Sequence, residues 1–104
     1  MKPKDDKRRA IRIDASGAFL SAGGVRLALA DLSTMGARTL EALPGAQEGD
    51  SLIATLTVPG RTKSGAFVVP ALVVANGARG LIVRYTALDA KAEKAIARFL
   101  ARKA

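Results

Sequence analysis

The chain contains neither cysteine nor histidine. Without cysteine there is no disulfide framework, no thiolate nucleophile and no thiolate site for zinc or an iron–sulfur cluster. Without histidine the chain lacks the commonest general base and the commonest metal ligand, and the Ser-His and Cys-His nucleophile pairs are excluded. Only carboxylates and lysines remain for catalysis. We therefore expect a protein that is not an enzyme and that uses no metal or cofactor.

Aromatic residues are also scarce, at 4% of the chain, whereas hydrophobic residues make up 49%. The core must then be built from Val, Leu, Ile and Ala, and 104 residues suffice for one modest core but not for two. No apolar run approaches the roughly 20 residues that cross a bilayer, and the N-terminal residues lack the apolar stretch of a signal peptide. We expect a single cytoplasmic domain without a membrane span.

Acidic residues are outnumbered, with nine Asp and Glu against 17 Lys and Arg, which gives a formal net charge of +8. Such a surface favours anionic partners, among them nucleotides, nucleic acid and acidic lipids, although an ordinary basic soluble domain has the same composition. Six of the basic residues lie within the first 12 positions: Lys2, Lys4, Lys7, Arg8, Arg9 and Arg12. This polar segment, residues 1–12, is predicted to be a flexible basic arm in front of a domain at residues 13–104.

Turn residues separate short apolar runs along the domain, which is the pattern of a compact antiparallel β protein. The predicted strands cover residues 18–21, 25–30, 37–40, 51–58, 67–75 and 80–86. Gly23-Gly24 is expected to separate the first two strands, and Asn76-Gly77 is a strong hairpin signal between the last two. Pro70 cannot donate a ladder hydrogen bond, so it should lie at an edge or a bulge.

The apolar period changes to that of a helix near the C-terminus, from about residue 88 to 102. Asp89 is the expected N-cap, and the basic residues of this helix are expected to form a solvated face. About six short strands and one terminal helix, without βαβ alternation, predict a mainly β fold. The expected architecture is a six-stranded antiparallel, split β-barrel whose open side is covered by the helix.

Two short motifs carry the candidate chemistry. Arg8 and Arg12 are four residues apart and project to the same side of a helical turn or a strand, with Arg9 placed to assist. Paired guanidinium groups suit phosphates and the O6/N7 edge of guanine. The same residues also fit an unremarkable basic tail.

The second motif is formed by Asp31, Ser33 and Gly36, after the predicted strand 25–30. Asp31 and Ser33 can face one side while Leu32 turns into the core, and Gly36 permits a backbone conformation closed to other residues. The carboxylate could accept hydrogen bonds from guanine N1–H and N2–H₂, and the hydroxyl could serve a base or a phosphate. A local Asx-type turn would use the same residue types.

Arg8-x-x-x-Arg12 followed by Asp31-x-Ser33-x-x-Gly36 resembles the two signature motifs of PilZ domains, bacterial receptors for the second messenger cyclic di-GMP. The motifs occur in the same order, and Gly80-Leu81-Ile82-Val83 looks like the late strand of that family, although Val83 stands where an aromatic residue is frequent. The resemblance implies a six-stranded barrel with a C-terminal helix, a cyclic di-GMP site on its outer surface, and ligand contacts from Arg8, Arg9, Arg12, Asp31, Ser33 and Gly36.

In that interpretation the ligand orders the basic arm and alters the contact with a downstream protein partner. The alternative is a basic β-barrel that binds single-stranded nucleic acid or another anionic partner nonspecifically. Such modules stack bases on aromatic side chains, and this chain offers only Phe19, Phe67, Tyr85 and Phe99, at least one of them expected in the core. A structural adaptor without a ligand is a third possibility.

Overall fold

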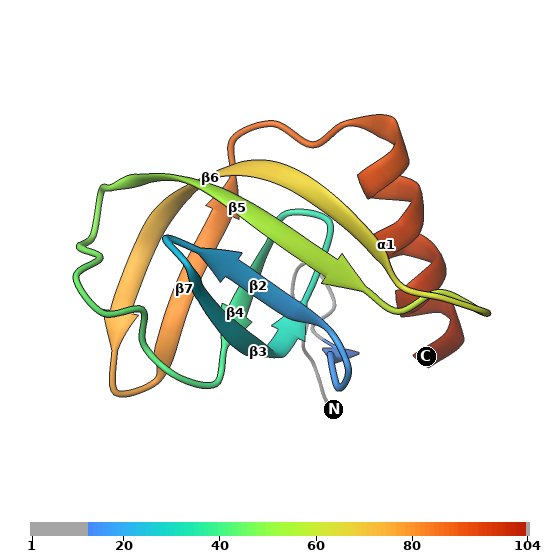
Figure 1. The fold of residues 1–104 in the computed structure, drawn as a ribbon, viewed down its shortest axis with the longest axis horizontal. Coiled ribbons are helices and arrows are strands. Elements are labelled where there is room, and N and C mark those ends of the chain that lie inside the picture. The colour runs from blue at the N-terminus through green and yellow to red at the C-terminus, as the bar shows by residue number, and fades with distance from the viewer. Residues whose placement is uncertain (1–12, 104) are drawn as a thin grey trace, which may run out of the picture.

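The computed structural model describes residues 13–103 (Figure 1). The strands are β1 (Ile13–Asp14), β2 (Phe19–Ala22), β3 (Val25–Leu32), β4 (Gly36–Thr39), β5 (Ser51–Val58), β6 (Gly65–Gly77) and β7 (Gly80–Tyr85), and the helix is α1 (Ala90–Lys103). The predicted fold class, a six-stranded antiparallel barrel with one C-terminal helix, is confirmed. Each predicted strand is present, with ends that differ by no more than a few residues.

The ring of strands is closed. Its order is β3-β2-β5-β6-β7-β4, and β4 pairs back with β3. The short strand β1 pairs with β3 beyond the part that pairs with β2, so β1 and β2 act as one interrupted strand. Gly17, with a φ of 90°, lies in the interruption, where a positive φ strongly favours glycine.

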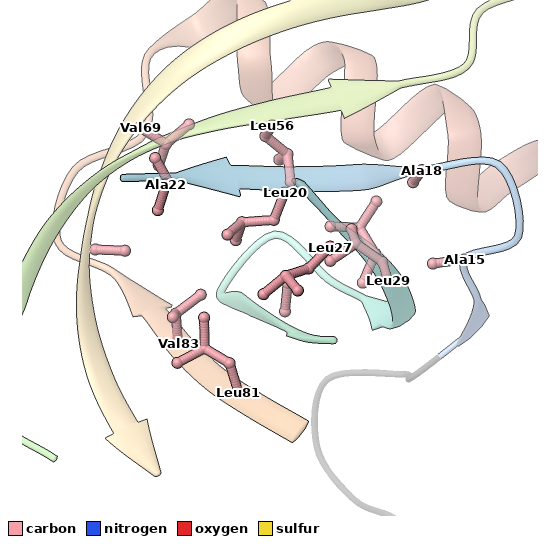
Figure 2. Close-up of a cluster of buried hydrophobic side chains, with 14 of the residues drawn as sticks. Ala15, Ala18, Leu20, Ala22, Leu27, Leu29, Leu56, Val69, Leu81 and Val83 are labelled. Atoms are coloured by element: carbon pink, nitrogen blue, oxygen red, sulfur yellow. The ribbon is translucent and has the colours of Figure 1, made fainter. Parts of the chain in front are cut away.

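The core is aliphatic, as the composition requires. Side chains from facing strands, among them Leu20, Leu56, Val69 and Leu81, point into a common interior (Figure 2). In β5 the predicted alternation holds, because Ala54, Leu56 and Val58 are buried while the residues between them face outward. Burial of this apolar area is the main source of stability, at about 25 cal/mol for each Å² removed from water.

Helix α1 lies against the barrel beside the loop that joins β5 to β6 (Figure 1). Asp89 is its N-cap, as predicted, since Asp89 Oδ1 accepts a hydrogen bond of 2.8 Å from the N–H of Ala92. Ile96 and Phe99 are buried, so Phe99 is a core aromatic. At the other end of α1, Arg102 Nη2 donates to the Pro59 carbonyl at 2.7 Å. Over residues 13–103, no helix combines the length and the apolar character needed to span a bilayer.

The hairpin between β6 and β7 turns two residues later than predicted, at Ala78-Arg79, with Gly77 paired to Gly80. Asn76 remains in β6 and binds the long loop before β5. Its Oδ1 accepts from the Leu43 N–H at 2.9 Å, and its Nδ2 donates to the carbonyls of Leu43 and Ala46, both at 2.8 Å. The side chain that indicated a turn is used instead for a tertiary contact.

Pro70 lies inside β6, where it pairs with Ile53 of β5. On its other side the ladder with β7 begins one residue later, at Ala71, and the Pro70 carbonyl accepts from the Thr86 N–H at 3.0 Å. The N–H and C=O of a strand residue point in the same direction, so the missing donor faces the end of the β6–β7 ladder. Pro70 therefore lies at the end of the β6–β7 ladder, within the sheet and not in an edge strand.

Candidate functional site

Asp31 lies in β3 on the outer surface of the barrel. Its neighbour Leu32 is fully buried, as predicted, and the alternation is broken before Asp31 by a register shift between Leu29 and Asp31 in the pairing of β3 with β4. The Asp31 side chain keeps 15% of its exposed area. The carboxylate is thus largely covered, yet it is not part of the aliphatic interior.

Arg38 holds this carboxylate from across the β3–β4 hairpin. The two residues are paired in the ladder, and Arg38 Nε donates to Asp31 Oδ2 at 3.1 Å. Arg38 Nη1 also donates to the Arg79 carbonyl at 3.1 Å. A hydrogen bond between ions is stronger than one between neutral groups, so Arg38 fixes the carboxylate and connects it to the turn between β6 and β7.

Ser33 organises the turn that follows. Its Oγ accepts hydrogen bonds from the N–H groups of Met35 (3.0 Å) and Gly36 (3.2 Å), and it donates to the Gly36 carbonyl at 3.3 Å. A hydroxyl has one donor and two acceptor sites, so all of them serve the turn. Direct contact of Ser33 with a base or a phosphate stays a prediction, whereas its role in shaping the turn is observed.

Gly36 begins β4, and the predicted reason for a glycine at this position is wrong. It is not one of the glycines with positive φ. Instead, a Cβ at Gly36 would overlap the carbonyl oxygen of Val83 in the neighbouring strand β7. Close approach of two backbones, and not an unusual backbone conformation, therefore requires the glycine.

Arg8, Arg9 and Arg12 lie outside the described residues. Strand β1 nevertheless fixes where the chain reaches the barrel, because Ile13 pairs with Leu32 and Asp14 with Asp31. Ile13, the first described residue and the one that follows Arg12 in the sequence, therefore lies beside the second motif.

Arg38 and Arg84 belong to this surface but were not predicted from the sequence. Arg84 is exposed on β7, and its Cα pairs with that of Gly36. The signal for Arg38 is the hairpin itself: if β3 extends to Leu32, counting outward from the turn places Asp31 opposite Arg38. The predicted end of this strand at residue 30 concealed that pairing of opposite charges.

No model of a known protein family matches the chain, and no similar curated protein is found. Within the described range, 13–103, no three carboxylates are gathered as a metal-binding group would require. The surface combines a fixed carboxylate, which can accept the N–H donors of a base edge, with cations suited to phosphate.

Proposed function

We propose that the protein is a cytoplasmic receptor for cyclic di-GMP, of the PilZ type, and that the ligand binds between residues 8–12 and the β3–β4 hairpin. One observation carries the proposal. The Asp31 carboxylate is held by Arg38 on the outer surface of the barrel, at the place where β1 leads in from Arg12. In this proposal both sequence motifs contribute to one region of the surface.

The chemistry of this region suits guanine. Asp31 would accept hydrogen bonds from guanine N1–H and N2–H₂, and adenine does not offer that pair of donors. A carboxylate accepts several hydrogen bonds at once, so its contact with Arg38 is compatible with base recognition. Arg8, Arg9 and Arg12 would supply bidentate contacts to the phosphates and to the O6/N7 edge. Ser33 and Gly36 would shape the turn beneath the ligand.

Binding would fix residues 1–12 against the barrel and so change the surface that a downstream protein partner meets. Hydrogen exchange of the backbone amides tests this step directly. We expect cyclic di-GMP to slow exchange within residues 1–12 and in the turn at Ser33, and to leave the β5–β6 loop unchanged. Equal exchange rates with and without ligand would contradict the switch.

Calorimetric titration tests the binding itself. The protein should bind cyclic di-GMP in preference to GMP and cyclic di-AMP. Arg12→Ala and Asp31→Ala should each weaken binding by roughly ten- to a hundredfold, since a hydrogen bond to a charged group contributes about 1.5–3 kcal/mol. Arg61→Ala removes the same positive charge as Arg12→Ala, but in the exposed β5–β6 loop away from the site, and it serves as the matched control. An equal loss in that control would indicate nonspecific attraction to the positive charge.

Nonspecific binding of single-stranded nucleic acid is the weaker alternative, because two of the four aromatic rings are occupied. Phe99 is buried, and the guanidinium of Arg26 lies 3.9 Å from the centre of the Phe19 ring. A platform for stacked bases needs open ring faces. Salt separates the two functions, since nonspecific binding to a phosphate backbone falls steeply with ionic strength and does not depend on Asp31.

A further inference from the structure

Exposed apolar side chains gather on the outer face of β5 and β6. Ile53 keeps 70% of its exposed area and Val68 keeps 67%. The ladder pairs Ile53 with Pro70 and Thr55 with Val68, so Ile53 and Val68 are diagonal neighbours on adjacent strands. Leu72 extends the same outward row along β6. Ile53, Val68, Pro70 and Leu72 are called the β5–β6 patch.

The patch is more apolar than its place in a strand demands. Outward positions of an antiparallel sheet are commonly polar when the face meets water. The preference of strands for β-branched residues does not explain Ile and Val here, because Thr55 and Thr57 supply the same branched shape at neighbouring outward positions. Contiguous exposed apolar side chains of this kind mark contact surfaces.

Charge indicates which partner fits. The outward residues of β5 and β6 are uncharged, and the nearest cations on the flanking strands are Arg84, opposite Leu72, and Arg26, two strands away from Thr55. The chain carries a net charge of +8, so most faces of two copies repel each other. This face lets two copies meet without like charges at the centre of the contact.

The fold also determines the kind of contact. β5 pairs with β6 along its whole length, whereas β2 covers its other side only at Thr55–Thr57 and β7 pairs with β6 only from Ala71 onward. The side chains of the patch project from the face of the sheet, so a contact made through them occurs face to face, with two sheets about 10 Å apart. In a two-fold arrangement the same patch serves both partners, so Ile53 and Val68 of each copy face the patch of the other.

We propose that the β5–β6 patch is the interface of a homodimer. A stable interface commonly buries about 800 Å² on each partner and about 20–30 residues a side, and the patch has only four residues, so the dimer should be weak and should form at micromolar concentrations or above. This proposal does not rest on the proposed cyclic di-GMP site, although Arg84 of that surface pairs with Leu72 of the patch.

Sedimentation velocity on the full chain, from low micromolar to near-millimolar concentration, tests the dimer. The wild-type protein should change from monomer to dimer across this range. Ile53→Lys and Val68→Lys should each weaken association by about a hundredfold or more, because they place an unpaired charge in the contact. Both side chains are exposed, so thermal unfolding followed by circular dichroism should show that the variants remain folded.

Leu40→Lys is the matched control, since Leu40 is also exposed, at 61%, and lies outside the patch. It adds the same charge, and its dimerisation should equal that of the wild type. Added salt gives an independent test, because it screens the repulsion between two positive chains and should tighten the dimer. A wild-type chain that stays monomeric at every concentration and salt level overturns the proposal. So does a loss of association in Leu40→Lys equal to that in Ile53→Lys.

Discussion

Arg38 Nε donates a hydrogen bond to Asp31 Oδ2 at 3.1 Å, from the paired position on the opposite strand of the β3–β4 hairpin. The same guanidinium reaches the Arg79 carbonyl through Nη1. One side chain therefore joins β3, β4 and the turn between β6 and β7. The orientation of the carboxylate in the candidate site depends on a residue that belongs to neither sequence motif.

Replacement of Arg38 by Ala should lower the affinity for cyclic di-GMP by about tenfold, because the Asp31 carboxylate loses one fixed donor. Arg38→Lys keeps the charge without the planar fork, so its affinity for cyclic di-GMP should lie between those of the wild type and Arg38→Ala. The pair is partly exposed, so the free energy of unfolding should fall by only about 1 kcal/mol. Calorimetric titration and urea unfolding measure the two effects. An affinity that Arg38→Ala leaves unchanged would rule out this positioning role.

Gly36→Ala should lower the free energy of unfolding by about 3 kcal/mol, because the new methyl group would overlap the Val83 carbonyl and push β4 away from β7. Gly77→Ala is the matched control. Gly77 is also a strand glycine without positive φ, and nothing lies within 4 Å of the position of its Cβ. This control should be neutral or slightly stabilising. Similar losses in both variants, measured by urea unfolding, would mean that close strand packing is not the reason for Gly36.

Ser33→Ala should cost about 1–2 kcal/mol of stability, since the N–H groups of Met35 and Gly36 lose their acceptor. The looser turn should also weaken cyclic di-GMP binding. Ser33→Thr keeps the hydroxyl and should restore most of both properties. Thr34→Ala, at the exposed neighbouring position, is the control and should change stability by less than about 0.5 kcal/mol. Denaturation and titration of all three variants would reveal whether the hydroxyl, and not merely the side-chain size, matters.

The parts of the fold that the sequence predicted correctly are those set by neighbouring residues. The alternation in Ser51–Val58 depends on a period of two, and the cap at Asp89 depends on a contact three residues away. The Gly23-Gly24 turn likewise uses only its own backbone, which has positive φ at both glycines. Local rules were sufficient for these elements.

The features that sequence reasoning missed depend on distant partners. Asn76 followed by Gly77 indicates a turn locally, but its amide bonds to the loop at Leu43 more than 30 positions away, and the turn moves two residues along the chain. The need for Gly36 comes from Val83, on a strand much later in the chain. Leu32 is buried between Asp31 and Ser33, as the alternation predicted, whereas the contact of Asp31 with Arg38 required the register of the hairpin.

Tyr85 gives a prediction about pH. Its hydroxyl is buried and makes no hydrogen bond to the residues that the structure describes. Burial raises the pKa of the Tyr85 phenol well above its ordinary value of about 10, because the phenolate would lose its hydration. In the unfolded chain this phenol ionises near pH 10, while the folded protein keeps the proton. The folded state then binds more protons, so the free energy of unfolding must fall as the pH rises above 10.

Tyr85→Phe removes both the titration and the hydroxyl without a partner. At neutral pH the variant should be as stable as the wild type or more stable by about 1 kcal/mol. Above pH 10 the wild type should lose up to about 1.4 kcal/mol for each pH unit from this residue, and the variant should not. Lysines titrate in the same range in both proteins, so the difference between their urea-unfolding free energies isolates Tyr85. That difference should widen from pH 9 to pH 11 (roughly one unit either side of the ordinary pKa), and a constant difference would mean that the phenol ionises equally in the folded and unfolded chains.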